Sequence, residues 1–128
     1  MSSRILIVDD NADLAEAMAM MLSICGFQTD TAYNGTLALE KARRFHPEFV
    51  LLDLGLPDID GYEVAAALRE DCDLKQAVVI AISAREVDPG LLQKRKARFD
   101  QALVKPVELE VLLRLLRRCE RSSHSEGE

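Results

Sequence analysis

Five polar residues in this 128-residue chain stand directly after short apolar runs that are typical of buried strands. Asp9 and Asp10 follow one run, and Asp53, Ser83 and Lys105 each follow another. If these runs are neighbouring strands of one parallel sheet, their carboxyl ends meet at a common edge, where α/β proteins bind ligands. We therefore expect three carboxylates, a hydroxyl and an ammonium group to gather there.

Three carboxylates in one place repel one another. At a separation of ~4 Å and an effective dielectric constant of 20, each pair costs about 4 kcal/mol. A divalent cation relieves this repulsion, and hard oxygen ligands without nearby histidine or cysteine favour Mg²⁺. The sequence therefore predicts a Mg²⁺ site that contains Asp9, Asp10 and Asp53.

One of these carboxylates is also placed to act as a nucleophile. An aspartate attacks phosphorus to form an aspartyl phosphate when a metal and an ammonium group neutralise the charge on the transferred group. Asp53 stands at the tip of the expected central strand, so we expect it to be the acceptor, with Lys105 and Ser83 contacting the phosphoryl oxygens. Asp9 and Asp10 would then hold the metal.

The elements that must position these residues alternate along the chain. Continuous apolar runs predict buried strands, and apolar residues at three- and four-residue steps predict helices. The expected strands are residues 5–8, 27–32, 49–52, 78–82 and 102–104, and the expected helices are about 12–25, 36–45, 62–70, 88–97 and one from near 107. Five strands alternating with five helices predict an α/β protein with a doubly wound parallel five-stranded sheet.

The first helix is bounded by Asn11 as N-cap and Gly26 as terminator. Its larger apolar residues predict a buried stripe, whereas Ala15, Ala19 and Met20 are expected to lie outside that stripe. The stripe consists of Leu14, Ala17, Met18, Met21, Leu22 and Cys25.

Length and charge narrow the class of protein. We expect one domain over residues 1–121 and a disordered tail over 122–128. A formal net charge of −6 argues against nucleic-acid binding.

No apolar run approaches the ~20 residues of a membrane helix, and no signal peptide is visible, so we expect a soluble cytoplasmic protein. Three widely spaced cysteines predict neither disulfides nor a zinc site.

Four motifs resemble the receiver domain of two-component response regulators. They are Ile5 to Asn11, Leu51 to Val64, Ile82-Ser83-Ala84 and Leu103 to Val107, in the family's order and approximate spacing. The resemblance implies a flavodoxin-like (βα)5 fold with strand order 2-1-3-4-5. It implies a phosphoacceptor domain, not a turnover enzyme, that assists its own phosphorylation and dephosphorylation.

The same resemblance implies further details of the site and of its partners. It implies Mg²⁺-dependent transfer from a histidine kinase or histidine phosphotransfer protein to Asp53, a metal contact from the Gly55 carbonyl, and a cis peptide before Pro106. The downstream protein partner is not identified, and dimerisation through the fourth and fifth helices stays open. Ala102 stands where many receivers carry an aromatic residue that reports phosphorylation, so coupling through that residue is not expected here.

Other functions remain open from the residues. A pseudo-receiver would bind partners without phosphorylation, although the complete acceptor set argues against it. A phosphatase of the haloacid dehalogenase type needs a second aspartate two residues after the nucleophile, where this chain has Gly55. A flavin-binding module needs a phosphate loop rich in serine and threonine, where this chain has Asp9 and Asp10. A stand-alone receiver and a receiver from a hybrid histidine kinase are both compatible with the sequence.

Overall fold

The computed structural model describes residues 3–84 and 99–126, with side chains described through residue 120. Strands and helices alternate, and the helix expected over 88–97 lies outside the described residues. The strands are β1 (Arg4–Val8), β2 (Gln28–Ala32), β3 (Phe49–Asp53), β4 (Val78–Ser83) and β5 (Gln101–Val104). The described helices are α1 (Ala12–Ile24), α2 (Gly35–Phe45), α3 (Gly61–Glu70) and α5 (Leu109–Glu126).

The five strands form one parallel sheet in the order β2-β1-β3-β4-β5, which confirms the predicted fold class. Strand β3 lies at the centre and is buried along its whole length, as its uninterrupted apolar sequence predicts for a strand covered on both faces. The strand order reverses between β1 and β3, so the ligand-binding crevice of such a sheet is expected beside their carboxyl ends.

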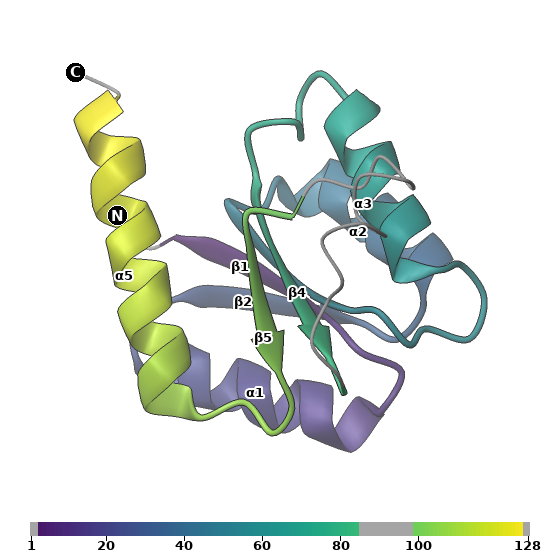
Figure 1. Cartoon of the computed structure of the whole chain (residues 1–128), viewed down its shortest axis with the longest axis horizontal. Helices are drawn as coiled ribbons and strands as arrows, with labels where there is room; N and C mark the ends of the chain where they lie inside the picture. Colours follow the sequence, from purple (N-terminus) through teal and green to yellow (C-terminus); the bar gives the residue numbers. More distant parts are fainter. Residues whose placement is uncertain (1–2, 85–98, 127–128) are drawn as a thin grey trace.

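Helices α1 and α5 lie on one side of the sheet and α2 and α3 on the other (Figure 1). One apolar cluster packs on each face. Alternate residues of the central strands point to opposite faces, so Leu52 packs with α2 and α3 while Leu51 packs with α1 and α5. Asp53 follows Leu52 and therefore points to the same face as Leu51. The acceptor candidate is thus on the side of the sheet that α1 and α5 cover.

Cap residues define the ends of α1 and α2, and those of α1 are the predicted ones. The Asn11 side chain accepts a hydrogen bond from the Leu14 amide, and Gly26 takes a positive φ of 103° just after the C-cap of α1. Helix α2 ends at Phe45 with His46 in a left-handed conformation at φ 52°, directly before Pro47. These ends fix the loops that enter and leave the sheet.

The predicted buried stripe of α1 is partly wrong: it correctly includes Leu22 and Met18 but leaves out Ala15 and Ala19. Ala15 is fully buried with Leu22, and Met18 and Ala19 pack against the same cluster. Leu14 is 45% exposed, and the predicted stripe members Met21 and Cys25 are exposed as well. The helix is apolar on most of its circumference, so the sequence pattern does not single out one face, and close approach to the sheet selects the small Ala15 side chain.

The C-terminal helix is longer than expected. The helical backbone of α5 continues to Glu126, into the range 122–128 for which the sequence predicts disorder, and that disorder stays a prediction. Residues 122–126 include no proline or glycine. Because each residue added to an existing helix forms one further backbone hydrogen bond, nothing in this segment ends α5 before Gly127.

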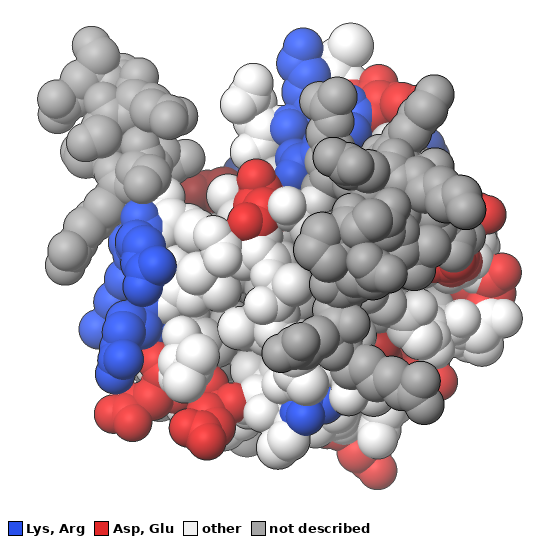
Figure 2. Space-filling view, viewed as in Figure 1, with Lys and Arg blue, Asp and Glu red and all other residues white. Residues whose placement is uncertain are grey.

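The solvent face of α5 carries basic residues on an otherwise acidic chain. Arg114, Arg117 and Arg118 line one surface hollow together with Glu110. Figure 2 shows a column of basic side chains along α5, with acidic side chains near the start of the helix. Among residues 3–84 and 99–126, no helix is long and apolar enough to span a membrane.

Candidate functional site

The carboxyl ends of four strands bring the predicted residues to one edge of the sheet. Val8 pairs with Leu52, Asp53 pairs with Ile82, and Ser83 pairs with Val104. Each strand therefore ends at nearly the same level, and the polar residue that follows or closes it stands at the common edge. The register produces the gathering of side chains that the sequence predicts.

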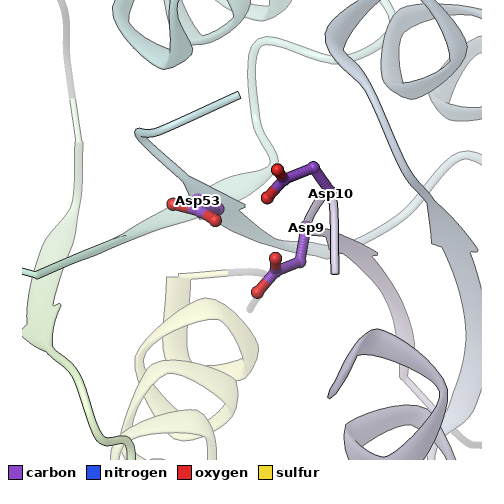
Figure 3. Close-up of side chains that lie close together, drawn as sticks. All are labelled: Asp9, Asp10 and Asp53. Carbon is purple, nitrogen blue, oxygen red and sulfur yellow. The ribbon is translucent and has the colours of Figure 1, made fainter. Parts of the chain in front are cut away.

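Asp9, Asp10 and Asp53 form a compact acidic cluster at this edge. One carboxylate oxygen of each lies within 4.8 Å of the others. Asp9 and Asp53 are only 8% and 6% exposed, whereas Asp10 is exposed to solvent. Figure 3 shows Asp9 and Asp10 at the end of β1, with Asp10 reaching toward Asp53 at the end of β3.

Backbone amides orient the two buried carboxylates. The amide of Asn11 donates to Asp9 Oδ1 at 3.0 Å, and the amide of Gly55 donates to Asp53 Oδ1 at 2.9 Å. These bonds leave the second oxygen of each carboxylate toward Lys105, whose Nζ lies 3.1 Å from Asp53 Oδ2 and 3.7 Å from Asp9 Oδ2. One lysine therefore partly neutralises both buried carboxylates.

The charges and the burial of the cluster raise the pKa values of both Asp9 and Lys105. Burial raises the pKa of Asp9, the hydrogen bond from Asn11 opposes that rise, and the nearby charge of Asp53 adds to it. Partial burial by itself lowers the pKa of Lys105, but the hydrogen bond and the charge of Asp53, with the charges of Asp9 and Asp10, raise it overall. Lys105 therefore stays protonated throughout the physiological pH range.

The donor set of the cluster fits a hard divalent cation. Its groups are carboxylate oxygens from Asp9, Asp10 and Asp53, and no cysteine or histidine belongs to this cluster among the described residues. Three negative charges against the single charge of Lys105 leave a net negative site that attracts a cation. Mg²⁺ binds such oxygen ligands together with water and phosphate oxygens.

The other predicted residues also lie at this edge. The Lys105 amide donates to the Ser83 carbonyl at 2.8 Å, which places the end of β4 beside the lysine. Gly55 is exposed in the loop after β3 and adjoins Asp53 through its own amide. The peptide between Lys105 and Pro106 is cis, as the resemblance implies.

Asp58 has a structural role that its neighbourhood in sequence does not indicate. It accepts hydrogen bonds from the amides of Gly35 and Thr36 at 2.8 and 3.1 Å and from the Thr36 hydroxyl at 2.8 Å. It therefore ties the loop after β3, which includes Gly55, to the first turn of α2. The partners lie more than twenty residues away in sequence, so no local pattern reveals the contact.

Asp60, in the same loop, caps α3 by accepting a hydrogen bond from the Tyr62 amide at 2.9 Å. Gly61 begins the helix, and a Cβ at this position would stand 2.8 Å from the Leu54 backbone. The loop after β3 is thus held at both ends, with Asp53 at its start and α3 at its end.

Comparison with known proteins places this geometry in a family. Residues 5–117 match the family model described as the response regulator receiver domain. The transcriptional regulatory protein KdpE of Mycobacterium tuberculosis is 34% identical over 124 residues, which are 97% of this chain and 54% of that protein. The chain therefore spans about half the length of the curated relatives it matches.

Solved structures agree with the family model. A CheY-like receiver domain protein from Methanospirillum hungatei superposes with a TM-score of 0.89 at 23% identity, covering 99% of this chain and all of that one. The receiver domain of the sensor histidine kinase PA1611 from Pseudomonas aeruginosa, which holds a magnesium ion in its active-site cleft, gives 0.77 at 27% identity and covers 92% of this chain and 97% of its own. From the family match and the shared fold, the chain belongs to the response regulator receiver domain family.

Proposed function

We propose that this domain accepts a phosphoryl group on Asp53 from a phosphohistidine of a histidine kinase or histidine phosphotransfer protein, in a reaction that requires Mg²⁺. The observation that carries the proposal is the contact of Lys105 Nζ with Asp53 Oδ2 at 3.1 Å, beside two further carboxylates. This contact combines a nucleophile with a fixed cation for the charge on the transferred group, which is the combination that phosphoryl transfer to a carboxylate needs.

Each residue of the site would have a separate task. A carboxylate oxygen of Asp53 forms a bond to phosphorus while the bond from phosphorus to the histidine nitrogen breaks, and the imidazole leaves with that electron pair. Lys105 remains charged and contacts a phosphoryl oxygen. The Ser83 hydroxyl donates a hydrogen bond to another phosphoryl oxygen.

Asp9, Asp10, Asp53 and the Gly55 carbonyl would hold the metal. When bound, Mg²⁺ neutralises negative charge at the acidic cluster and on the phosphoryl oxygens. The chain's own contribution is to fix the carboxylates in advance, because the amides of Asn11 and Gly55 already orient Asp9 and Asp53. The residues therefore need little rearrangement to accept the cation.

The phosphorylated domain would signal through a changed contact surface. Ala102 is exposed on β5 and its methyl group has no rotamers to exchange, so the output would not pass through an aromatic side chain at this position. Dimerisation through α5 and the helix that the sequence predicts over 88–97, which lies outside the described residues, and the identity of the downstream protein stay as proposals for this chain.

The proposal is tested by incubating the purified chain with Mg²⁺ and acetyl phosphate and measuring its intact mass. We expect the mass of one phosphoryl group to be added to the wild-type chain and to D58N, and nothing to be added to D53N. D58N is the matched control, because Asp58 lies in the same loop but binds the backbone of α2. Equal phosphorylation of D53N and wild type would contradict the proposal.

A second arm uses the protein donor. A phosphorylated histidine phosphotransfer domain should lose its label to the wild-type chain in the presence of Mg²⁺ and retain it when EDTA is present. Transfer that is unchanged by EDTA would show that the acidic cluster has no metal-dependent role.

A further inference from the structure

An apolar cavity of about 370 Å³ adjoins the acidic cluster on the face of the sheet that α1 and α5 cover. Leu14, Ala15 and Met18 of α1 form one side, and Pro106 and Val107 form the other. Its volume lies at the lower end of the range of small-molecule sites in proteins. The cavity therefore has room for a short aliphatic chain beside the acceptor carboxylate.

The polar groups of this cavity are confined to the site already described. Among the described residues that line it, the polar ones are Asp9, Asp53 and Lys105, and the remaining wall is apolar. A ligand seated in the cavity thus meets the acceptor carboxylate and a fixed ammonium group at one end and hydrocarbon elsewhere. With Mg²⁺ bound at the acidic cluster as proposed above, the negative charge of that end is neutralised, and this division of polarity suits a phosphoryl head joined to an apolar tail.

Two small or short side chains leave this space open. Ala15 is fully buried, and its methyl group fills little of the volume between α1 and the sheet. Val107 is half-buried where the chain leaves the cis peptide to enter α5. On α1, Ala15 thus contributes only a methyl group to the cavity wall, between the larger Leu14 and Met18.

We propose that this cavity binds the apolar part of a small acyl phosphate and that the domain takes its phosphoryl group from acyl phosphates with aliphatic chains longer than acetyl. The inference rests on the proposed function of Asp53. The bond from phosphorus to the acyl oxygen breaks as the bond to the Asp53 oxygen forms, and the aliphatic carboxylate leaves with the electron pair. Charge and atoms balance without another reactant.

The expected preference follows from burial of the chain. Each fully buried methylene contributes about 0.8 kcal/mol, which is about a fourfold change in affinity. Butyryl phosphate carries two methylenes more than acetyl phosphate, so we expect its second-order rate constant for phosphorylation of the chain to be about fifteenfold higher. The two donors have aliphatic leaving groups of similar basicity, and their hydrolysis in buffer alone provides the reactivity control.

The test compares the two donors on four proteins. V107F and A15L each fill part of the cavity, and we expect both to reduce the ratio of the butyryl to the acetyl rate constant toward one. M20A is the matched control, because Met20 is 67% exposed on α1 and does not line the cavity. We expect this control to keep the wild-type ratio.

A binding measurement without transfer gives a second readout. Butylphosphonate carries the anionic head and the aliphatic chain but no labile bond. In methyl NMR spectra it should shift the signals of Leu14, Met18 and Val107 in the wild-type chain, and it should shift Leu14 and Met18 less in V107F. The same titration also shows that each variant is folded.

The inference and the proposed function fail in different ways. No Asp53 adduct from any phosphodonor would overturn both. An adduct from acetyl phosphate or from a phosphohistidine protein, with no preference for the butyryl donor, would overturn the inference alone. If V107F slows only transfer from a phosphohistidine protein, an apolar side chain of that partner occupies the cavity, and the acyl phosphate inference is again overturned.

Discussion

Neutralising one carboxylate of the acidic cluster should stabilise the metal-free domain and remove its response to Mg²⁺. In D10N the side chain keeps its size but loses its charge, and Asp10 is the exposed member of the cluster. Its substitution therefore disturbs packing least. The prediction joins the structural and the functional roles of the cluster, because the repulsion that weakens the metal-free fold is the feature that attracts the cation.

The magnitude follows from the geometry. Two carboxylates whose oxygens lie within 4.8 Å repel by about 1 kcal/mol in a water-like dielectric and by about 3.5 kcal/mol at an effective dielectric constant of 20. Solvent screens the exposed Asp10, so the lower figure applies to its pairs with Asp9 and Asp53, and attraction to Lys105 offsets part of their sum. We expect D10N to gain about 1 kcal/mol without metal, or about 4 °C in Tm.

The assay is urea unfolding with EDTA and with MgCl₂. A ligand at one hundred times its Kd stabilises the folded state by about 2.7 kcal/mol, so wild type should gain an amount of this order at saturating Mg²⁺. D10N should gain much less. D13N is the matched control, because Asp13 lies in the first turn of α1 and its substitution removes a favourable interaction with the helix dipole of about 0.5 kcal/mol.

Either of two results would contradict this prediction. D10N that is less stable than wild type in EDTA would show that repulsion within the cluster does not weaken the metal-free fold. Equal stabilisation of D10N and wild type by Mg²⁺ would show that Asp10 does not belong to the metal site.

Three further predictions concern neighbouring groups. Backbone hydrogen bonds at α2 lower the pKa of Asp58 well below its usual ~3.9, so the stability it contributes is complete above that pH and is lost as pH falls through the lowered pKa. Urea unfolding of D58N should therefore show its largest deficit against wild type near pH 7 and a smaller one below pH 4, and a constant deficit would argue against the cap. K105Q should destabilise the EDTA-treated domain and increase its stabilisation by Mg²⁺, because the compensating charge is gone; a smaller response to Mg²⁺ in the same assay would contradict this. L112A should lower the free energy of unfolding by about 2–5 kcal/mol, since Leu112 is fully buried under the sheet, whereas V111A at a 45% exposed position should change it by less than about 1 kcal/mol.

The arrangement of the site could be predicted because it depends on strand ends. Asp53 and Lys105 each stand at the end of a recognisable apolar run, and parallel strands bring such ends to one edge. The lysine contact with Asp53 then needs no further information than the order of the strands. The position of the site can therefore be predicted from local sequence patterns and the strand order.

The buried face of α1 and the role of Asp58 depend on contacts between segments that are distant in sequence. The face of α1 that is buried could not be predicted, because Leu14 and Met21 are as apolar as the buried Leu22, and only the distance to the sheet selects Ala15. Asp58 resembles an ordinary turn residue until its partner Gly35 is known. Such contacts are properties of the packed chain.

Chemical trapping of the phosphorylated residue tests the central claim most directly. Borohydride reduces an aspartyl phosphate to homoserine, and peptide mapping then identifies the residue that carried the phosphoryl group. After incubation with Mg²⁺ and a phosphodonor, we predict homoserine at position 53 and unmodified aspartate at positions 9 and 10. Homoserine at either of the latter positions, or at none of the three in a chain that has gained the mass of a phosphoryl group, would contradict the account.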